Sequence, residues 1–204
     1  KPTWPERFDY KTLANLKKVM GYVRYSAEML CEPVDDTHYF RPEMTHLYDA
    51  SNLDKIEDVV AYIDPSVTES KQGDYKAIVA IGHLPNDHRE YVCGCWIRHA
   101  TNAAMVGAAY RLDEQYQLKQ IGLESNGFQR FLKRDFDAEA LKRGRFLPLK
   151  LNSHYEAKSI RIERLVAAHD TGDLMFCKEC GDTPLLLEQL YQWEPQGREH
   201  DDGP

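Results

Sequence analysis

Acidic residues follow two apolar segments of this 204-residue sequence, and two more stand close to its end. Asp64 follows an apolar run of five residues, and Glu124 follows a second, shorter run. Two carboxylates held close together repel one another unless a divalent cation lies between them, and Mg²⁺ accepts such oxygen ligands. Asp201 and Asp202 are available as a third acid, which would complete a two-ion site for phosphodiester hydrolysis. The pattern therefore favours metal-dependent phosphodiester chemistry.

Each of these acids taken alone fits a simpler interpretation. Pro65 follows Asp64, and an aspartate before a proline commonly begins a turn. Glu124 alone is typical of a strand end or of a surface position. Their joint placement is less expected by chance than each acid alone, which keeps the metal-site interpretation open beside the simpler one.

The elements that must position these acids can be predicted from the same pattern. The short apolar run before Asp64, bounded by breakers, indicates a strand buried on both faces. Strands over residues 77–82 and 90–99 should extend it into an antiparallel meander, and a helix over 102–117 should lead to a strand over 120–124. If the first strand is central and the fourth adjoins it in parallel, Asp64 and Glu124 emerge side by side at one edge of the sheet.

The remaining elements complete a fold prediction. We expect a helix that Asn126 caps, a second short helix over 138–143, an edge strand over 146–151, a helix over 156–169, an extended piece over 174–176 and a helix over 184–191. Before the sheet, Asp9 can cap a helix over 10–20, and a second helix follows over 22–30. Three antiparallel strands followed by helix-linked strands predict an α/β, ribonuclease H-like (RuvC-type) mixed β-sheet with helices on both faces.

The net charge of −7 is unevenly distributed along the chain. Residues 129–164 hold ten lysines and arginines against five acids, whereas residues 169–204 hold two against nine. A basic middle beside an acidic end fits a DNA-phosphate surface next to a metal site, and it fits two solvated helix faces equally well. The residues that we expect to line a DNA path are Lys133, Arg134, Lys142, Arg143, Arg145, Lys158 and Arg161.

The five cysteines have no disulfide-framework spacing, which favours a reducing compartment. Cys177 and Cys180 form a lone CxxC, which could join Cys93 and Cys95 in a four-cysteine zinc site. Because no other residues have ligand spacing, we favour ordinary thiols.

Several motifs resemble the nuclease domain of the large terminase subunit of tailed bacteriophages. The resemblance covers nearly the whole chain, including a lead-in that begins at Trp4. Its motifs are moderately specific one by one and strong together. They are Ile63-Asp64-Pro65-Ser66, Asp74-Tyr75-Lys76-Ala77, Ile121-Gly122-Leu123-Glu124-Ser125-Asn126-Gly127-Phe128, and Leu190-Tyr191 followed by Glu199-His200-Asp201-Asp202.

This resemblance implies a two-metal endonuclease that cuts concatemeric double-stranded DNA at the start and end of viral genome packaging. By matching position, Asp64 would bridge both ions and Glu124 would bind one of them. Asp201 and Asp202 would supply the third acid, and Asp74 would be an auxiliary ligand or would orient a bound water. The implied cofactors are two Mg²⁺ or Mn²⁺ ions.

The resemblance also implies the setting of the chain. We expect a piece of a larger protein, in which residues 1–55 are a helical lead-in and linker from a missing ATPase domain and 56–204 are the nuclease domain. Its partners would be double-stranded DNA, that N-terminal ATPase domain, the small terminase subunit and the portal, in the host cytoplasm and outside the mature virion. We expect no membrane association, and a monomeric isolated domain. Because the sequence has no GxxxxGK(S/T) motif, we expect no ATPase activity.

Two other classes of protein stay open at this point. An actin-like ATPase shares the sheet and an early acid, but it needs a Gly/Thr-rich phosphate loop that Pro65-Ser66-Val67-Thr68 fits poorly. A catalytically silent DNA-binding or docking domain would use the basic residues without the acids.

Overall fold

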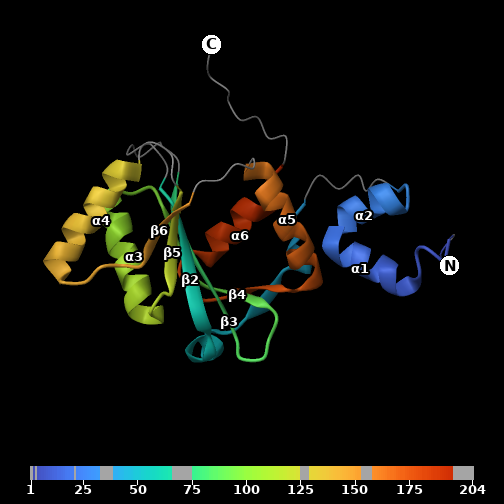
Figure 1. Cartoon of the computed structure of the whole chain (residues 1–204), viewed down its shortest axis with the longest axis horizontal. Coiled ribbons are helices and arrows are strands. Elements are labelled where there is room, and N and C mark those ends of the chain that lie inside the picture. The colour runs from blue at the N-terminus through green and yellow to red at the C-terminus, as the bar shows by residue number, and fades with distance from the viewer. Residues whose placement is uncertain are drawn as a thin grey trace, which may run out of the picture. The chain divides into compact units, whose positions relative to one another are not determined.

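The computed structural model describes residues 2, 4–20, 22–32, 39–65, 75–124, 129–152 and 158–194 (Figure 1). The chain divides into two compact units. The helical unit comprises Lys1–His46, Glu156–Leu174 and Glu188–Pro204, and the sheet unit comprises Leu47–Tyr155 and Met175–Leu187. The predicted division into residues 1–55 and 56–204 concerns a neighbouring ATPase domain and stays a prediction.

The helical unit contains α1 (Tyr10–Met20), α2 (Tyr22–Met29) and α5 (Lys158–Thr171). Asp9 caps α1 as predicted, because its carboxylate accepts a hydrogen bond from the backbone N–H of Thr12 at 2.7 Å. The two N-terminal helices therefore lie where the sequence places them.

A buried polar cluster holds distant segments of the helical unit together. His169 of α5 is fully buried, and its Nε2 lies 2.9 Å from the hydroxyl of Thr45. The same hydroxyl lies 2.8 Å from that of Tyr191, the last residue of α6 (Thr183–Tyr191). Because buried polar groups need partners, this chain of hydrogen bonds fixes the three segments relative to one another.

A seven-stranded mixed sheet has the strand order β1-β7-β4-β3-β2-β5-β6. β2 pairs antiparallel with β3, and β3 with β4, whereas β5 is parallel to β2 and β6 is parallel to β5. This order confirms the predicted meander and the inner position of the strand that ends at Asp64. It also confirms the edge position of the strand predicted over residues 146–151, which is β6. The strands are β1 (His46–Tyr48), β2 (Glu57–Asp64), β3 (Lys76–His83), β4 (Glu90–Arg98), β5 (Gln120–Glu124), β6 (Leu149–Asn152) and β7 (Leu174–Cys177).

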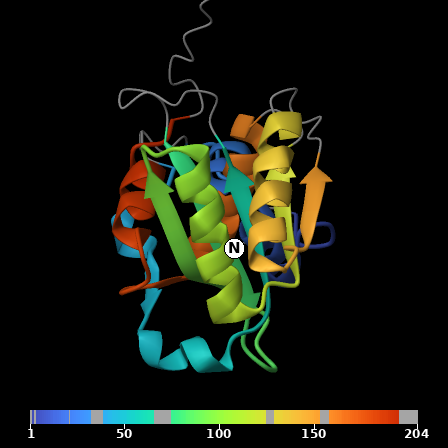
Figure 2. The same cartoon turned by 90° about the vertical axis from the view of Figure 1, so that its left-hand side faces the viewer.

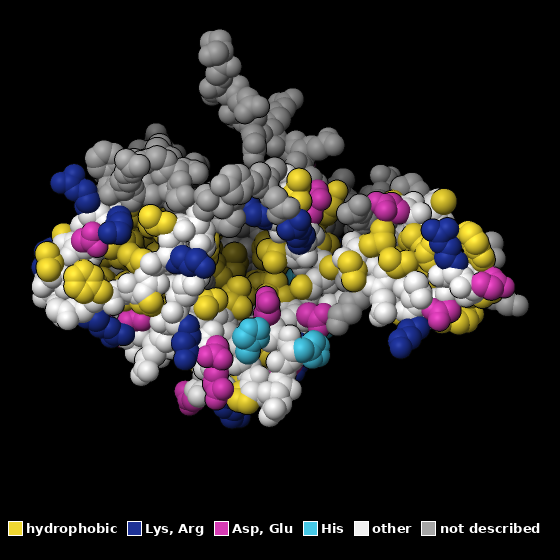
Figure 3. Space-filling model, in the orientation of Figure 1, with side chains coloured by type: hydrophobic (Ala, Val, Ile, Leu, Met, Phe, Trp, Pro, Cys, Tyr) yellow, Lys and Arg dark blue, Asp and Glu magenta, His cyan; other side chains and the backbone are white. Residues whose placement is uncertain are grey.

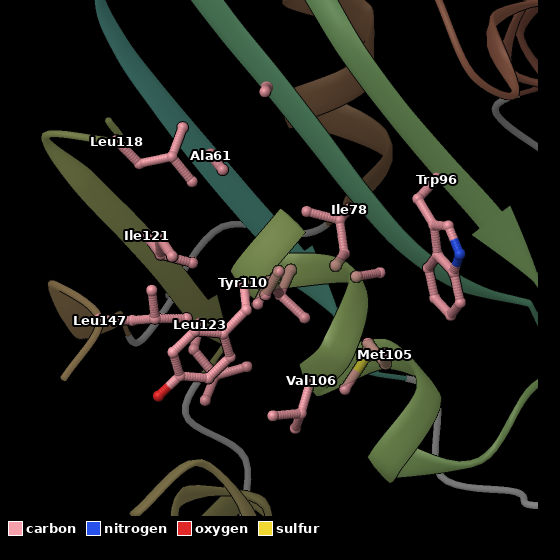
Figure 4. Packing of buried hydrophobic residues seen from close by; sticks show 14 of the residues in the cluster. Ala61, Ile78, Trp96, Met105, Val106, Tyr110, Leu118, Ile121, Leu123 and Leu147 are labelled. Carbon is pink, nitrogen blue, oxygen red and sulfur yellow. The ribbon is translucent and has the colours of Figure 1, made fainter. Parts of the chain in front are cut away.

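Helices α3 (Asn102–Tyr116) and α4 (Gln129–Arg143) cover one face of this sheet, called here the helix-covered face (Figure 2). The main hydrophobic core lies between these two helices and the strands of the sheet. Ile121 and Leu123 of β5 belong to one buried cluster with Tyr110 and Met105 of α3 (Figure 4). Burial of this apolar surface is the main force that holds the helices on the strands.

The predicted break in the helix after β5 is wrong. One continuous helix, α4, replaces the two short helices expected around Phe131 and over 138–143. Leu132, Phe136 and Ala140 follow one another at four-residue spacing and are each at most 2% exposed. Because this apolar stripe is unbroken and contains no glycine or proline, a single helix buries it best.

The prediction that β2 is buried on both faces is also wrong. Val59, Ala61 and Ile63 point into the core, whereas Val60 between them is 43% exposed. The strand therefore has one face in the core and one less buried face. By alternation, Asp64 belongs to the less buried face together with Val60. The sequence analysis also missed the short strand β1 and the 3₁₀ segments Pro42–Met44 and Ala50–Lys55.

In the described part of the chain, no helix combines the length and the apolar character that a membrane span requires.

Candidate functional site

The two acids that end β2 and β5 lie at one edge of the sheet. Ile63 pairs with Leu123 in the parallel register, so Asp64 and Glu124 are the next residues on the two strands. Adjacent strands lie about 4.8 Å apart, which brings the two backbone positions within reach of one shared cation. β4 and β6 end at this edge and β3 begins there, and we call it the carboxyl edge. The predicted side-by-side placement of these two positions is confirmed for the backbone.

Both acid positions belong to the same face of the sheet. Side chains alternate along a strand, and Ile63 and Leu123 are fully buried on the helix-covered face. The positions of Asp64 and Glu124 therefore belong to the opposite face, where Asp64 is half-buried. Parallel strands in register thus give two acidic positions on one face of the sheet.

Tyr62 and Gly122 lie immediately before the acids on that face. They are paired in the β2–β5 register. A Cβ atom at position 122 would lie 2.6 Å from Cδ2 of Tyr62 and 3.0 Å from Nδ2 of Asn152, which ends β6. Glycine is therefore required for the Tyr62 ring to lie against the backbone of β5. Sequence analysis singled out neither Tyr62 nor Asn152, because their proximity depends on strand register.

Lys76 fixes the backbone that leaves Asp64. This first residue of β3 is 1% exposed, and its Nζ donates a hydrogen bond to the carbonyl oxygen of Pro65 at 2.7 Å. A buried ammonium group is costly without hydrogen-bond acceptors, and this contact supplies one of them. The interaction holds the chain at the point where the predicted metal ligand ends its strand. The sequence motif that contains Lys76 did not indicate that this lysine would be buried.

The other predicted ligands lie outside the described residues. These are Asp74 and the acids Asp201 and Asp202. Within the described ranges, no group of three or more histidine, cysteine, aspartate or glutamate side chains could hold a metal ion. The structure therefore brings together two of the predicted ligand positions, at the level of the backbone, and the full ligand set stays a prediction.

Several of the basic residues expected to line a DNA path form ion pairs with acids on their own helix. Lys133 lies 3.3 Å from Asp137, and Arg143 lies 2.8 Å from Glu139, so several of them are paired along α4. Figure 3 accordingly shows Lys and Arg side chains interspersed with Asp and Glu over the side of the molecule that contains α4. The hydrogen bond from Arg143 also lowers the pKa of Glu139.

The direction of α4 separates this basic set further. The helix begins near the carboxyl edge and descends over 15 residues, about 22 Å, to the opposite edge of the sheet. Lys133 and Arg134 therefore lie in the half of α4 nearer the carboxyl edge, whereas Lys142 and Arg143 lie toward the opposite edge. Arg145 also lies toward that edge, and it forms an ion pair with the buried Asp113 of α3. Lys158 and Arg161 begin α5 in the helical unit, and Arg161 Nε is buried.

The prediction of ordinary thiols is wrong for one pair of cysteines, those of the CxxC. Cys177 and Cys180 form a disulfide, while Cys93 and Cys95 are buried free thiols. Burial raises the pKa of each of these two thiols to about 12, which keeps them neutral at physiological pH. A disulfide removes the CxxC thiolates that a zinc ion would need, so this arrangement gives no support to the zinc alternative.

A further pair of side chains lies at the carboxyl edge. The rings of Tyr75, before β3, and His99, after β4, have centroids 3.9 Å apart and planes tilted by 32°. Both residues are exposed. Sequence analysis found no metal-site spacing for His99 and gave this pair no role.

Comparison with known proteins places this geometry in a fold class. No protein-family model matches the chain, and no curated protein matches its sequence. Solved structures do match, at low identity. The chain aligns with the human cytomegalovirus terminase nuclease domain at a TM-score of 0.56 and 17% identity, covering 76% of this chain and 84% of that one.

Two bacteriophage proteins give similar alignments. The large terminase of thermophilic bacteriophage D6E matches at a TM-score of 0.60 and 10% identity over 91% of this chain, which spans 44% of the D6E chain. The nuclease domain of the bacteriophage SPP1 large terminase, with bound Mn, matches at 0.53 and 13% identity, covering 81% and 87% of the two chains. The fold is ribonuclease H-like, as predicted. It is the fold of terminase large-subunit nuclease domains.

Proposed function

We propose that this chain is the nuclease domain of a terminase large subunit, and that it cuts concatemeric double-stranded viral DNA during genome packaging. The observation that carries the proposal is the register of β2 and β5, which puts Asp64 and Glu124 at neighbouring positions on one face of a terminase-nuclease fold. The manganese bound by the SPP1 domain, which shares this fold, supports a divalent cation as cofactor.

The residues at the carboxyl edge fit such a cation. Mg²⁺ and Mn²⁺ prefer oxygen ligands, and two carboxylates on adjacent strands supply them without a competing thiol or imidazole set in the described residues. Asp64 would hold both ions and Glu124 one, with Asp201, Asp202 and Asp74 as the further acids. When bound, two such ions activate a water and stabilise the leaving 3′ oxygen.

The chain's own residues would prepare this edge for the reaction. Lys76 holds the end of β2 through Pro65, which fixes the direction of the Asp64 backbone. The Tyr62 ring lies against Gly122, one position before the acids on the same face of the sheet, and packs β2 against β5 there. Preorganised ligands of this kind reduce the reorganisation that binding of a cation would otherwise require.

DNA would approach the carboxyl edge, where Lys133 and Arg134 of α4 can neutralise backbone phosphates. Nothing described at this edge reads bases, so the site and timing of cutting would come from the partners. These are the N-terminal ATPase domain, the small terminase subunit and the portal. The reaction would take place in the host cytoplasm, with no ATP hydrolysis by this chain.

The test is cleavage of plasmid DNA by the purified chain with Mn²⁺ or Mg²⁺. Wild type should convert supercoiled plasmid to cut forms, and Asp64→Asn should slow this by at least about a hundredfold, because it removes a charged ligand. Asp58→Asn is a matched control, since Asp58 lies on the same strand at the opposite edge, where its side chain is 73% exposed. Equal cutting by wild type and Asp64→Asn would overturn the assignment. DNA binding without any metal-dependent cutting would favour a silent docking domain.

A further inference from the structure

The Tyr75–His99 ring pair lies next to the acids in the sheet. Asp64 pairs with Ala77 across β2 and β3, and Ala77 pairs with Ile97 across β3 and β4. Tyr75 and His99 each lie two residues beyond that last pair, at the carboxyl edge. Two residues along a strand and one strand spacing across it give about 8 Å between the backbone positions of Asp64 and Tyr75.

The ring pair also belongs to the face that carries the acids. Directly paired residues share a face, and residues two apart on one strand share a face as well. Asp64 and Ala77 therefore lie on the same face. Tyr75 and His99 come one residue beyond Lys76 and Arg98, the pair that ends the β3–β4 ladder, and the alternation continued by that one residue assigns them the parity of Ala77 and Ile97. Lys76 lies between Tyr75 and Ala77 along the chain, so it has the opposite parity, and it is buried on the side of the helix-covered face.

The ring pair is accessible to a ligand. Tyr75 is 40% exposed, and His99 is exposed as well. A stack of two rings uses one face of each ring, and the exposure of both residues is what a third flat group needs to reach an outer ring face.

We propose that the Tyr75–His99 stack is a platform for an unpaired base of the DNA strand next to the cleaved phosphate. The outer ring face continues the stack with one nucleobase, about two to three nucleotide steps from the acids at 3.4 Å per step. Stacking on an aromatic ring tolerates every base, because every base has a π face. This inference deepens the proposed function, on which it rests.

The platform implies a particular class of DNA substrate. Inside an intact duplex both faces of each base are already stacked, so no face is offered to a protein ring. A frayed end, a bulge or a distorted site offers such a face. The chain should therefore bind DNA with an unpaired base near the cut more tightly than it binds a perfect duplex.

The experiment compares two short labelled duplexes that are identical except for one unpaired adenine. Binding is measured by fluorescence anisotropy at one fixed salt concentration, with Ca²⁺ as the only divalent cation. We expect wild type to bind the bulged duplex about tenfold more tightly. Tyr75→Ala and His99→Ala should each reduce this preference to about twofold or less, and Tyr75→Phe should keep it because the ring remains.

Two control variants lie at the opposite edge of the sheet unit. Phe146→Ala removes an aromatic ring that is 67% exposed before β6, and His83→Ala removes an exposed imidazole at the far end of β3. Both should keep the wild-type preference. Thermal unfolding of each variant shows whether it is folded, and the two alanine variants test the platform independently of each other.

Each outcome bears on one proposal. Equal binding of the two duplexes by wild type overturns the platform, and so does an unchanged preference in both alanine variants. Mn²⁺-dependent cleavage by wild type is followed on the same duplexes. Cleavage without the binding preference overturns the platform alone, whereas the preference without cleavage overturns the proposed nuclease function alone.

Discussion

Nζ of Lys76 donates a hydrogen bond to the carbonyl oxygen of Pro65 at 2.7 Å, from a side chain that is 1% exposed. The lysine begins β3 and the proline follows the last residue of β2, so the bond closes the two strands at the carboxyl edge. Its position directly after Asp64 connects the stability of the sheet to the placement of the predicted metal ligand.

Replacement of Lys76 by methionine should therefore affect both properties. The change leaves the Pro65 carbonyl without this donor, and we expect the free energy of unfolding to fall by about 1–3 kcal/mol. Metal-dependent plasmid cutting should fall as well, because the end of β2 is less well fixed. Urea denaturation and the plasmid assay measure the two effects.

Lys119→Met is the matched control for this change. Lys119 is 67% exposed and forms a surface ion pair with Asp58 at 3.5 Å, an interaction that contributes at most about 1 kcal/mol. It should leave cutting unchanged. A Lys76→Met variant as stable and as active as wild type would show that the buried lysine has no part in positioning Asp64.

Gly122→Ala should destabilise the sheet by about 1–3 kcal/mol. The added methyl group would lie 2.6 Å from the Tyr62 ring, so the ring or the strand must shift. Gly107→Ala is the opposite case, because the nearest atom to its added methyl would be Arg111 Nη1 at 3.6 Å on α3. In a helix this change should stabilise by about 0.5–1 kcal/mol.

Chemical denaturation of the two alanine variants measures this contrast. The double variant Gly122→Ala with Tyr62→Ala should lose less stability than the sum of the two single changes, since the ring that the added methyl group would meet is gone. If the double variant were less stable than the sum of the single changes, Tyr62 would not be the group that requires glycine here.

The two ends of α4 should contribute unequally to DNA binding. Arg134→Gln, near the carboxyl edge, should weaken duplex binding and reduce the slope of log K against log salt by about 1. Arg143→Gln should change little, because that guanidinium lies at the far end of the helix and pairs with Glu139 and Glu114. Salt titrations of binding by the two variants provide the measurement. A larger effect of Arg143→Gln would place the DNA along the opposite edge.

Stability should decrease at alkaline pH because of Cys93 and Cys95. Burial raises the pKa of each thiol from the ordinary 9.0 to about 12, so the folded state keeps protons that the unfolded state releases. The stabilisation is complete below about pH 9 and is lost as the pH rises toward 12.

Between pH 8 and pH 9.5 the two thiols together should account for a loss of about 1–2 kcal/mol. The free energy of unfolding from urea denaturation at both pH values measures it. Cys93→Ala combined with Cys95→Ala should remove most of this dependence, whereas Cys31→Ala should not, because Cys31 is exposed. The same slope in the double variant would assign the effect to other groups.

Much of the local structure could be predicted from the sequence. The cap at Asp9, the helix that begins after Thr101 and the ends of β2 and β5 at acidic residues follow from patterns within a few neighbouring residues. The error at α4 concerns the same kind of local pattern. Leu132, Phe136 and Ala140 already have four-residue spacing with no breaker between them in the sequence, and the structure shows that all three are buried along one continuous helix.

The sequence by itself determined that Asp64 and Glu124 end apolar strands and that the chain alternates strands and helices, since periodicity and breakers are local properties. Only the tertiary structure decided that Ile63 pairs with Leu123, and hence that the strand positions of the two acids belong to one face. It also decided which residues surround them: Lys76 beneath the strand end, Tyr62 against Gly122, and the Tyr75–His99 stack. The physical reason is that strand register is set by packing between residues distant in the sequence, and a shift of one residue would send every side chain to the other face.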